Sequence, residues 1–326
     1  MKIGKNHLTK IIFLILGLIV IAGCSILFFP QRLNFNMNSN KLLHIIIKIR
    51  LPEVLIAIMA GACLGLAGAI MQIILGNPLA SPFTLGISAA SAFGAALAIC
   101  IELYFGIAWL NPGIFAFVFS IISIIILLVI MKFSGISQRS IILIGLAVNF
   151  FFNAANTFLQ YFATPDAVYQ ITFWTAGSLT TAKIEHSGIL FIILSISLFI
   201  SILFSKDLGI IQQGERSAVM HGVNVSFERI LFLLICSLLA SSCVSIVGII
   251  GFVGLVAPHI SRLLGLEAPK NLLISSSISG ALLLVIADVI SKTLLYPTIL
   301  PISAVTSIFG IPLLLFLLII KGREQK

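Results

Sequence analysis

Long apolar runs recur along the whole chain, and they constrain its fold more than any other feature. Nine runs are long enough to cross the hydrocarbon core of a bilayer, which is roughly 30 Å thick and takes about 20 helical residues. They lie near residues 11–29, 45–75, 84–105, 110–132, 140–163, 188–205, 227–249, 270–291 and 303–320. With 60% hydrophobic and 9% charged residues, a soluble globule would expose far too much apolar surface. The sequence therefore predicts an all-α, polytopic membrane protein in which residues 1–326 form a single transmembrane domain.

A tenth, shorter apolar run near 252–265 is interrupted by helix-breaking residues, which brings the expected number of transmembrane helices to about ten. It belongs to the stretch GIIGFVGLVAPHISRLLGL at 248–266. The breaks and the polar residues that close the run are Gly248, Gly251, Gly254, Pro258, His259 and Arg262. Glycine and proline interrupt a helix and leave backbone groups without their helical hydrogen bonds. Lipid cannot supply these hydrogen bonds, so such a segment must be buried in protein or line a cavity. We therefore expect it to take part in a transport path or its gate.

The distribution of positive charge predicts the orientation of the chain. With the N-terminus in the cytoplasm, the cations that fall outside are Arg32, Lys41, Lys48, Arg50, Lys183 and Lys292. The other Lys and Arg residues fall in cytoplasmic segments, which follows the positive-inside rule and predicts an even number of crossings with both termini cytoplasmic. The formal charge of +9 then reflects orientation, and the 25 Phe residues lie mostly in apolar runs, so nucleic-acid binding is not expected.

The five cysteines show no CxxC spacing and lie in apolar runs, which favours buried thiols that only pack. Residues 21–24 read IAGC after a basic start and an apolar run, a pattern that also resembles a signal peptide with a lipidation site at Cys24. Removal of this segment would upset the charge asymmetry and the even number of crossings. We therefore favour a first transmembrane helix, and lipid found on Cys24 by acyl labelling would reverse that interpretation.

The largest polar segment of the chain interior, residues 205–229, contains no apolar span. Its GERSAVMHGV stretch predicts a short helix at the cytoplasmic surface that ends at a glycine. A charged segment of this size is often a solvated connector, but a compact helix with small residues also suits docking into a groove of another protein. The candidate docking residues are Glu215, Ser217, Ala218, His221 and Gly222.

Two further motifs predict close helix packing and a turn. Gly61 and Gly65 form a small-xxx-small pair that lets two helices approach closely. In NPLASPFTLGISAASAFG at 77–94, Asn77, Pro78 and Pro82 end one helix before small residues open the next. This segment is either a tight cytoplasmic turn or part of a gate.

Seven motifs occur in an order that resembles a known transporter family. They are RLPE at 50–53, NPLASPFTLGISAA at 77–90, WTAGSL at 174–179, GERSAVMHGV at 214–223, GIIGFVGLVAPHISRLLG at 248–265, GALLLVIAD at 280–288 and LPISAVTSIFGIPLLLFLL at 300–318. Together they span nearly the whole chain and are similar to the FecCD family, the permease subunits of ABC importers for iron-siderophore complexes, haem and vitamin B12. The resemblance implies a type II ABC importer permease fold. It also implies a second permease subunit beside this one, two ATPase subunits below and an extracytoplasmic substrate-binding protein above.

The sequence is consistent with this division of labour, because it contains no GxxxxGK[ST] phosphate-binding loop. The resemblance implies that the helix matching GERSAVMHGV seats in a cleft of the ATPase, with Glu215, Ser217, Ala218 and Gly222 at the matching positions. The chain is thus expected to be a transport subunit and not an enzyme. We expect no catalytic residue and no bound cofactor, since ATP is used by the partner subunits.

On the outer face, the resemblance implies contacts between basic permease residues and acidic residues of the binding protein. The matching positions are Arg50 and Lys292, and exposed pairs of this kind mainly steer docking. Family members commonly carry a second Arg where this chain has Glu53, and a Glu where it has Ile299. The first departure inverts one charge of a basic docking face, and a compensating cation on the partner would fit Glu53.

Isolated polar groups in the apolar runs allow other interpretations. Asp288 is a candidate proton or ion site, but nearby Lys292 favours a structural or docking pair. His259 and Arg262 have no carboxylate or thiol beside them, so we expect a contact at a cytoplasmic helix end and no metal site. A proton- or sodium-driven secondary transporter would need more intramembrane carboxylates, and a non-transporting scaffold would not need the broken run.

Within the family, iron-siderophore complexes are the commonest substrate class, and they are the predicted substrate here, with haem or vitamin B12 as the alternative. The predicted permease partner is either a second copy of this chain or a paralogue. The predicted location is the cell membrane, with lipid around the helices and both termini cytoplasmic.

Overall fold

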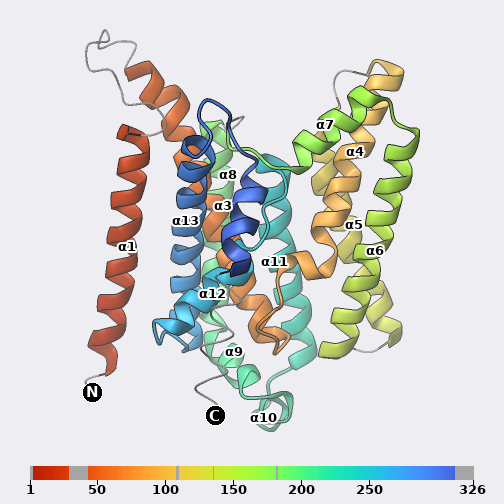
Figure 1. Cartoon of the computed structure of the whole chain (residues 1–326). Coiled ribbons are helices and arrows are strands. Elements are labelled where there is room, and N and C mark those ends of the chain that lie inside the picture. Colours follow the sequence, from red (N-terminus) through yellow and green to blue (C-terminus); the bar gives the residue numbers. More distant parts are fainter. Residues whose placement is uncertain (1–2, 29–42, 108–109, 135, 181–182, 313–326) are drawn as a thin grey trace.

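The computed structural model describes residues 3–28, 43–107, 110–134, 136–180 and 183–312, and the regular elements in these ranges are all helices (Figure 1). They are α1 (Ile3–Phe28), η1 (Ile46–Arg50), α3 (Leu51–Ile74), η2 (Pro82–Leu85), α4 (Ile87–Phe105), α5 (Pro112–Ser134), α6 (Gln138–Phe162), α7 (Pro165–Thr175), α8 (Ile184–Leu203), α9 (Ser205–Gln212), α10 (Glu215–Met220), α11 (Val225–Val247), α12 (Val253–Leu263) and α13 (Pro269–Thr293). A last helix, which has no label in Figure 1, covers Ile302–Pro312.

Eight helices of the described part are long and apolar enough to cross a membrane. They are α1, the continuous helix Leu43–Ile74 that contains η1 and α3, and then α4, α5, α6, α8, α11 and α13. Two further apolar runs form shorter helices, α12 and Ile302–Pro312. The predicted run 303–320 continues beyond Pro312 into residues outside the described part. The prediction of an all-α membrane protein with about ten transmembrane helices is confirmed.

The helix α3 lies at the centre of the bundle and packs against α8, α11, α12 and α13. In the most apolar 18-residue stretch of the helix Leu43–Ile74, 83% of the residues are buried, compared with 17% in the corresponding stretches of α1 and of α8. Figure 1 shows α1 standing at one edge of the molecule. Exposed apolar residues on peripheral helices of this kind are typical of a surface that faces lipid.

Glycines bring the central helices together. A Cβ atom on Gly61 would overlap the carbonyl oxygen of Gly280, and one on Gly65 would overlap that of Ser276. Only the absence of a side chain on α3 allows α13 to lie at this separation. The predicted packing face of Gly61 and Gly65 is confirmed, and α13 is the helix that it contacts.

The bundle has two distinct ends. We call the end that carries α9 and α10 the inner end, and the opposite end, which carries α7 and the turn after α13, the outer end (Figure 1). The polar segment 205–229 forms two short helices, α9 and α10, where the sequence predicted one. The helix α7 was not predicted as a separate element. It is capped by Thr164, whose hydroxyl accepts a hydrogen bond from the backbone N–H of Ala167.

The segment between α3 and α4 forms a compact turn, as its prolines predicted. The short helix η2 is closed by reciprocal hydrogen bonds between Ser81 and Thr84. Gly86 follows with φ +78°, a left-handed conformation that favours glycine, and α4 begins at the next residue.

Candidate functional site

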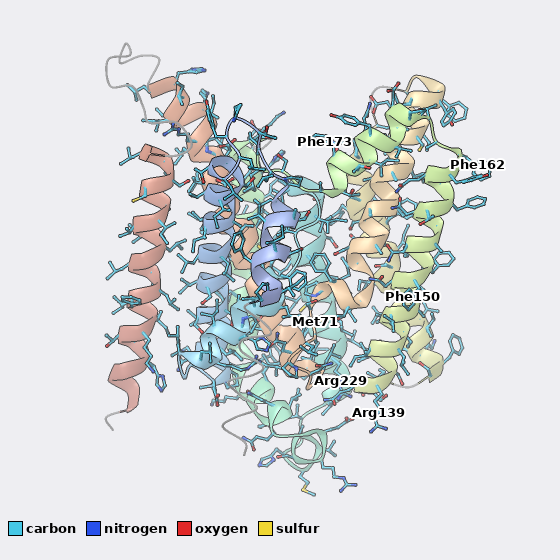
Figure 2. All side chains as sticks on the ribbon, viewed as in Figure 1. Met71, Arg139, Phe150, Phe162, Phe173 and Arg229 are labelled. Carbon is cyan, nitrogen blue, oxygen red and sulfur yellow. The ribbon has the colours of Figure 1, made fainter. Side chains whose placement is uncertain are left out.

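At the inner end, α10 is fixed to the bundle by a buried arginine. The guanidinium of Arg229 donates to both carboxylate oxygens of Glu215, at 3.0 and 3.2 Å, and to the carbonyl oxygen of Ile136 at 2.9 Å. The Arg229 side chain is 1% exposed and that of Glu215 is 51% exposed. Figure 2 shows Arg229 near the inner end of the bundle, above the place of α10. A bidentate pair of this kind sets orientation as well as position, so α10 has a defined direction relative to α11.

The buried face of α10 and the turn after it complete this attachment. Ala218 is fully buried and packs in a small cluster with Ile211 and Val225. After the helix, Gly222 adopts φ +79°, and the backbone of Val223 donates to the carbonyl oxygen of Ala218 at 3.0 Å. This is a glycine-terminated helix end, as the sequence predicted.

The opposite face of α10 forms an exposed tip, which we define as residues 219–222. Val219 is 64% exposed and Met220 is 83% exposed, and His221 and Gly222 are also exposed. A Cβ atom on Gly222 would meet no other atom within 4 Å. The tip therefore presents apolar side chains on a rigid, compact support, which suits insertion into a groove of another protein.

The predicted coupling residues thus occupy different places in one small structure. Glu215 and Ala218 attach α10 to the bundle, and the carbonyl oxygen of Ser217 lies 2.8 Å from Nδ1 of His221. Sequence reasoning missed Arg229, because its partner is 14 residues away on another helix. It also missed Val219 and Met220; the signal for them was an apolar pair inside the most polar segment of the chain.

The stretch 248–266, which we call the broken segment, starts where three of the sequence motifs meet. Gly248 ends α11 with φ +76° and ψ −166°, and a Cβ atom there would press on the backbone of Trp174 and Gly177. The backbone of Ser178 donates to the carbonyl oxygen of Val247 at 2.9 Å, and Ser303 Oγ donates to that of Ala176 at 2.7 Å. The stretches 174–179, 248–251 and 300–303 therefore meet in space, although they lie far apart in the sequence.

Proline and glycine also explain how α12 packs against α3. Pro258 has no N–H, so the carbonyl oxygen of Gly254 lacks its usual helical donor. This oxygen lies against the bare α-carbon of Gly68, where a Cβ atom would overlap it. The freed carbonyl is thus enclosed by protein, as membrane depth requires. Gly251 lies in the short segment between α11 and α12. Phe252 follows it with a φ of +64°, and α12 begins at the next residue.

His259 and Arg262 lie at the inner end of α12 and take part in contacts within the protein. Arg262 Nη1 donates to the side-chain oxygen of Gln72 on α3, and Gln72 Nε2 donates to the carbonyl oxygen of Leu255 at 3.3 Å. Nδ1 of His259 lies 2.8 Å from the same carbonyl oxygen. These hydrogen bonds fit the expected helix-end contact, and a role of the two residues in a gate stays a prediction. Among the described residues, no three His, Cys, Asp or Glu side chains gather at one place.

A small apolar cavity of about 80 Å³ lies beside the broken segment, between α12, α13 and the helix Ile302–Pro312. Its walls include Phe252, Val256, Ile286 and Phe309. Phe252 also packs against Gly310, where a Cβ atom would lie 2.8 Å from the Phe252 Cβ. The strained residue at the start of α12 is therefore fixed by the last described helix.

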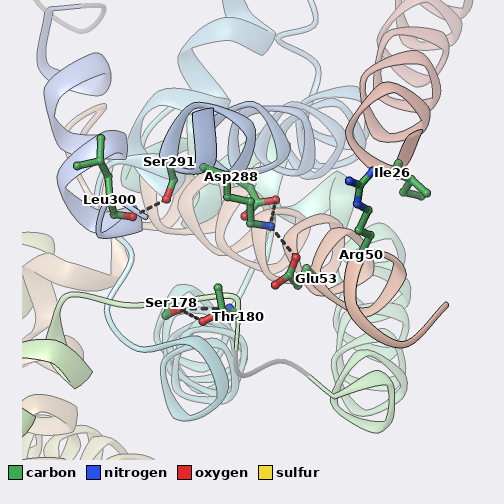
Figure 3. A network of polar contacts seen from close by, with 9 residues as sticks. Ile26, Arg50, Glu53, Ser178, Thr180, Asp288, Ser291 and Leu300 are labelled. Carbon is green, nitrogen blue, oxygen red and sulfur yellow. Dashed lines mark hydrogen bonds and ion pairs between the residues drawn. The ribbon is translucent and has the colours of Figure 1, made fainter. Parts of the chain in front are cut away.

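At the outer end, four charged side chains are buried together. Lys292 Nζ donates to Glu53 at 2.8 Å and to Asp288 at 2.7 Å, and Arg50 Nη1 donates to the carbonyl oxygen of Ile26 at 2.7 Å (Figure 3). All four residues are less than 9% exposed. The interpretation of Asp288 and Lys292 as a structural pair agrees with this geometry, and Glu53 finds its compensating cation within its own chain. A role of Arg50, Glu53 and Lys292 in docking stays a prediction.

The cysteines of the described part are all free thiols, and four of the five are buried. Cys24 lies within α1, near its outer end, and is partly exposed. Its position on a helix fits the first transmembrane helix that we favoured, and its lipidation stays an open alternative.

Comparison with known proteins gives concordant matches along the chain. A model of the FecCD transport family matches residues 9–320. A permease of Helicobacter pylori assigned to an iron chelatin transport system is 34% identical, over 87% of this chain and 85% of its own. The hemin transport system permease HmuU of Yersinia pestis is 31% identical over 96% of both chains. The vitamin B12 import system permease BtuC of Yersinia enterocolitica is 32% identical over 83% of this chain and 80% of its own.

Among solved structures, an inward-facing ABC transporter assigned to the metal-chelate type matches with a TM-score of 0.86. It is 29% identical and covers 95% of this chain and 98% of its own. The matches extend over the inner end, the broken segment and the outer end alike.

Proposed function

The chain belongs to the FecCD transport family of ABC importer permeases, and from this premise we propose that it passes an iron-siderophore complex from an extracytoplasmic binding protein into the cytoplasm. It is a membrane subunit and not an enzyme, and ATP hydrolysis lies in separate subunits. The proposed partners are a second permease subunit, two ATPase subunits and the binding protein. No cofactor is proposed for this chain.

The observation that supports coupling to an ATPase is the exposed tip of α10. Its apolar residues stand on a helix that the Glu215–Arg229 pair and Ala218 hold in one orientation. Movement of an ATPase groove around the tip would reach α11 through Arg229, and α11 ends at Gly248, where the broken segment begins. We propose that ATP binding and hydrolysis in the partners drive alternating access along this route, with the segment 248–266 at the gate.

The substrate class rests on the relatives and on the family's commonest cargo. The Helicobacter pylori relative is assigned to iron chelatin transport, which supports a ferric siderophore. The hemin and vitamin B12 permeases among the relatives make these two compounds the alternative. The positive-inside distribution supports both termini in the cytoplasm, with the inner end facing the ATPases.

The test is ATP hydrolysis by the complete complex in proteoliposomes. The chain is co-expressed with its ATPase and binding protein, and the binding protein is supplied empty or loaded with ferric siderophore, haem or cobalamin. We expect the ferric siderophore to stimulate hydrolysis and the other two to leave it at the basal rate. Stimulation by haem or cobalamin alone would show that this compound is the substrate instead of a ferric siderophore, and it would leave the importer function unchanged.

A further inference from the structure

The backbone turns sharply at Phe252, just before α12. Phe252 has φ +64° and ψ −26°, and the N–H of Val253 donates to the carbonyl oxygen of Gly251 at 2.8 Å. A hydrogen bond that closes three residues around a positive φ is the rare and strained form of the γ-turn. Among the residues that the structure describes, Phe252 is the one non-glycine residue with positive φ. A bulky side chain therefore stands where only glycine would be free of strain.

A second turn of the same size shows the relaxed form. At the start of α11, the N–H of Val225 donates to the carbonyl oxygen of Val223 at 3.0 Å. Asn224 between them has φ −79° and ψ +84°, the common form of the γ-turn. The same hydrogen bond can thus be made without strain, as the turn before α11 shows. Strained backbone persists only where the surrounding structure holds it, and it is concentrated at functional sites and switch regions.

The last described helix holds Phe252 in its strained conformation. A Cβ atom on Gly310 would lie 2.8 Å from Cβ of Phe252 and 3.1 Å from its Cγ. The base of the Phe252 side chain therefore rests on the bare α-carbon of Gly310, in the helix Ile302–Pro312, which is the unlabelled dark blue helix of Figure 1. The carbonyl oxygen of Phe252 accepts a hydrogen bond from the N–H of Val256 at 2.8 Å, within the first turn of α12. Phe252 thus connects the start of α12 to the last described helix.

Empty space lies beside this contact. The apolar cavity of about 80 Å³ has Phe252 and Phe309 in its walls, together with Ile286 and Ala287 of α13. Protein interiors are close-packed, and voids larger than a water molecule are few. A ring in the wall of such a void can change its position without displacing another side chain. The surroundings of Phe252 therefore suit a residue that has two conformations.

We propose that Phe252 is the switch residue of the broken segment. Its φ stays positive only while Gly310 supports the side chain. When the last described helix separates from α12 during transport, the backbone relaxes to negative φ and the start of α12 moves. This inference rests on the proposed function and extends it, because it names the residue at which the segment 248–266 changes shape. Phe252 is a positioning residue, since it acts through α12 and not on the substrate.

The first test compares Phe252→Gly with Phe252→Ala in the complete transporter in lipid nanodiscs. Both variants lose the ring, but glycine adopts positive φ freely and alanine does not. Backbone hydrogen exchange over residues 253–256 is measured by mass spectrometry without nucleotide. We expect it to be at least about fivefold slower in Phe252→Gly, because only the alanine variant retains the strain. If Phe252 only fills space, glycine leaves the freer backbone and exchanges as fast as alanine or faster, which would overturn the proposal.

The second test displaces the side chain of Phe252 from its support. Gly310→Ala should speed exchange over residues 253–256 by at least about fivefold. Gly188→Ala is the matched control, since its Cβ atom would meet nothing within 4 Å, and it should change neither exchange nor uptake. In the Phe252→Gly background there is no Cβ atom to meet, so Gly310→Ala should change exchange by less than about twofold. An equal effect in both backgrounds would contradict the proposal. The pair of Phe252 variants decides the matter if Gly310→Ala does not assemble.

The third test follows the movement in the wild type. Exchange over residues 253–256 is compared without nucleotide and during turnover with ATP and loaded binding protein. We expect exchange to be at least about threefold faster during turnover, because the hydrogen bonds that Phe252 makes with the first turn of α12 must break as its backbone changes. Unchanged exchange in a complex that takes up substrate would overturn the switch and leave the proposed function intact. A wild-type complex without ATP-dependent uptake would contradict the proposed function itself.

Discussion

Single residues whose side chains are absent or buried determine how the central helices meet. Gly68 is the clearest case, because its bare α-carbon lies against the Gly254 carbonyl that Pro258 leaves without a donor. We expect Gly68→Ala to displace α12 and to lower the free energy of unfolding by about 1 to 3 kcal/mol, as for other overpacked sites. Gly188→Ala is the control, since its Cβ atom would meet nothing within 4 Å. Thermal unfolding in detergent compares the two; equal stability of both variants would refute this packing.

Also at the residue scale, Glu215 neutralises a cation that has almost no access to water. Glu215→Gln removes the charge but keeps the size, so Arg229 stays buried without a counter-ion and retains only neutral acceptors, among them the carbonyl oxygen of Ile136. A hydrogen bond to a charged group contributes about 1.5 to 3 kcal/mol to the stability of the folded protein. Because the Glu215 carboxylate is half-exposed, water screens the pair, and its contribution lies toward the lower value. We expect less ATPase to co-purify with the variant. Glu185→Gln, an exposed carboxylate at the outer end of α8, should retain the ATPase fully.

At the scale of elements, α10 and its tip act as one unit. Gly222→Trp places a large ring in open space on the tip, so it should leave the permease folded and inserted but obstruct the ATPase groove. Gly222→Ala is the control, because it imposes the same backbone strain at φ +79° without the bulk. ATP-dependent uptake should be abolished in the first variant and reduced only slightly in the second. Normal uptake by Gly222→Trp would mean that the tip does not seat in the ATPase.

The elements also show what the sequence could predict. The apolar runs predicted the long helices to within a few residues, except that α1 begins earlier, at Ile3, and Gly61 and Gly65 predicted the packing face, because these signals are local and periodic. The pairs Glu53–Lys292 and Glu215–Arg229 were not predicted, since each joins helices that are adjacent only in the fold. For the same reason, the contact of Gly68 with Gly254 and the junction of 174–179, 248–251 and 300–303 appear only in three dimensions.

At the scale of the whole molecule, the two ends of the bundle present different surfaces joined by the central helices. The inner end carries the apolar tip of α10, and the outer end carries the exposed apolar residues Leu294, Leu295 and Tyr296 close to the buried Lys292, which pairs with Glu53 and Asp288. Between them, α3 contacts α11, α12 and α13. This arrangement suits the proposed function, in which a partner contacts the subunit at its inner end and the path between the helices changes in response.

The most direct test of the importer function is whether ATP or an ion gradient drives uptake. The complete complex is reconstituted in proteoliposomes with loaded binding protein on the outer side and ATP inside, and uptake of the ferric siderophore is measured with and without ionophores. We predict that uptake requires ATP hydrolysis, continues when proton and sodium gradients are collapsed, and fails in Gly222→Trp. Uptake that continues without ATP and stops when the ionophores are added would contradict the account and would identify an ion-coupled transporter.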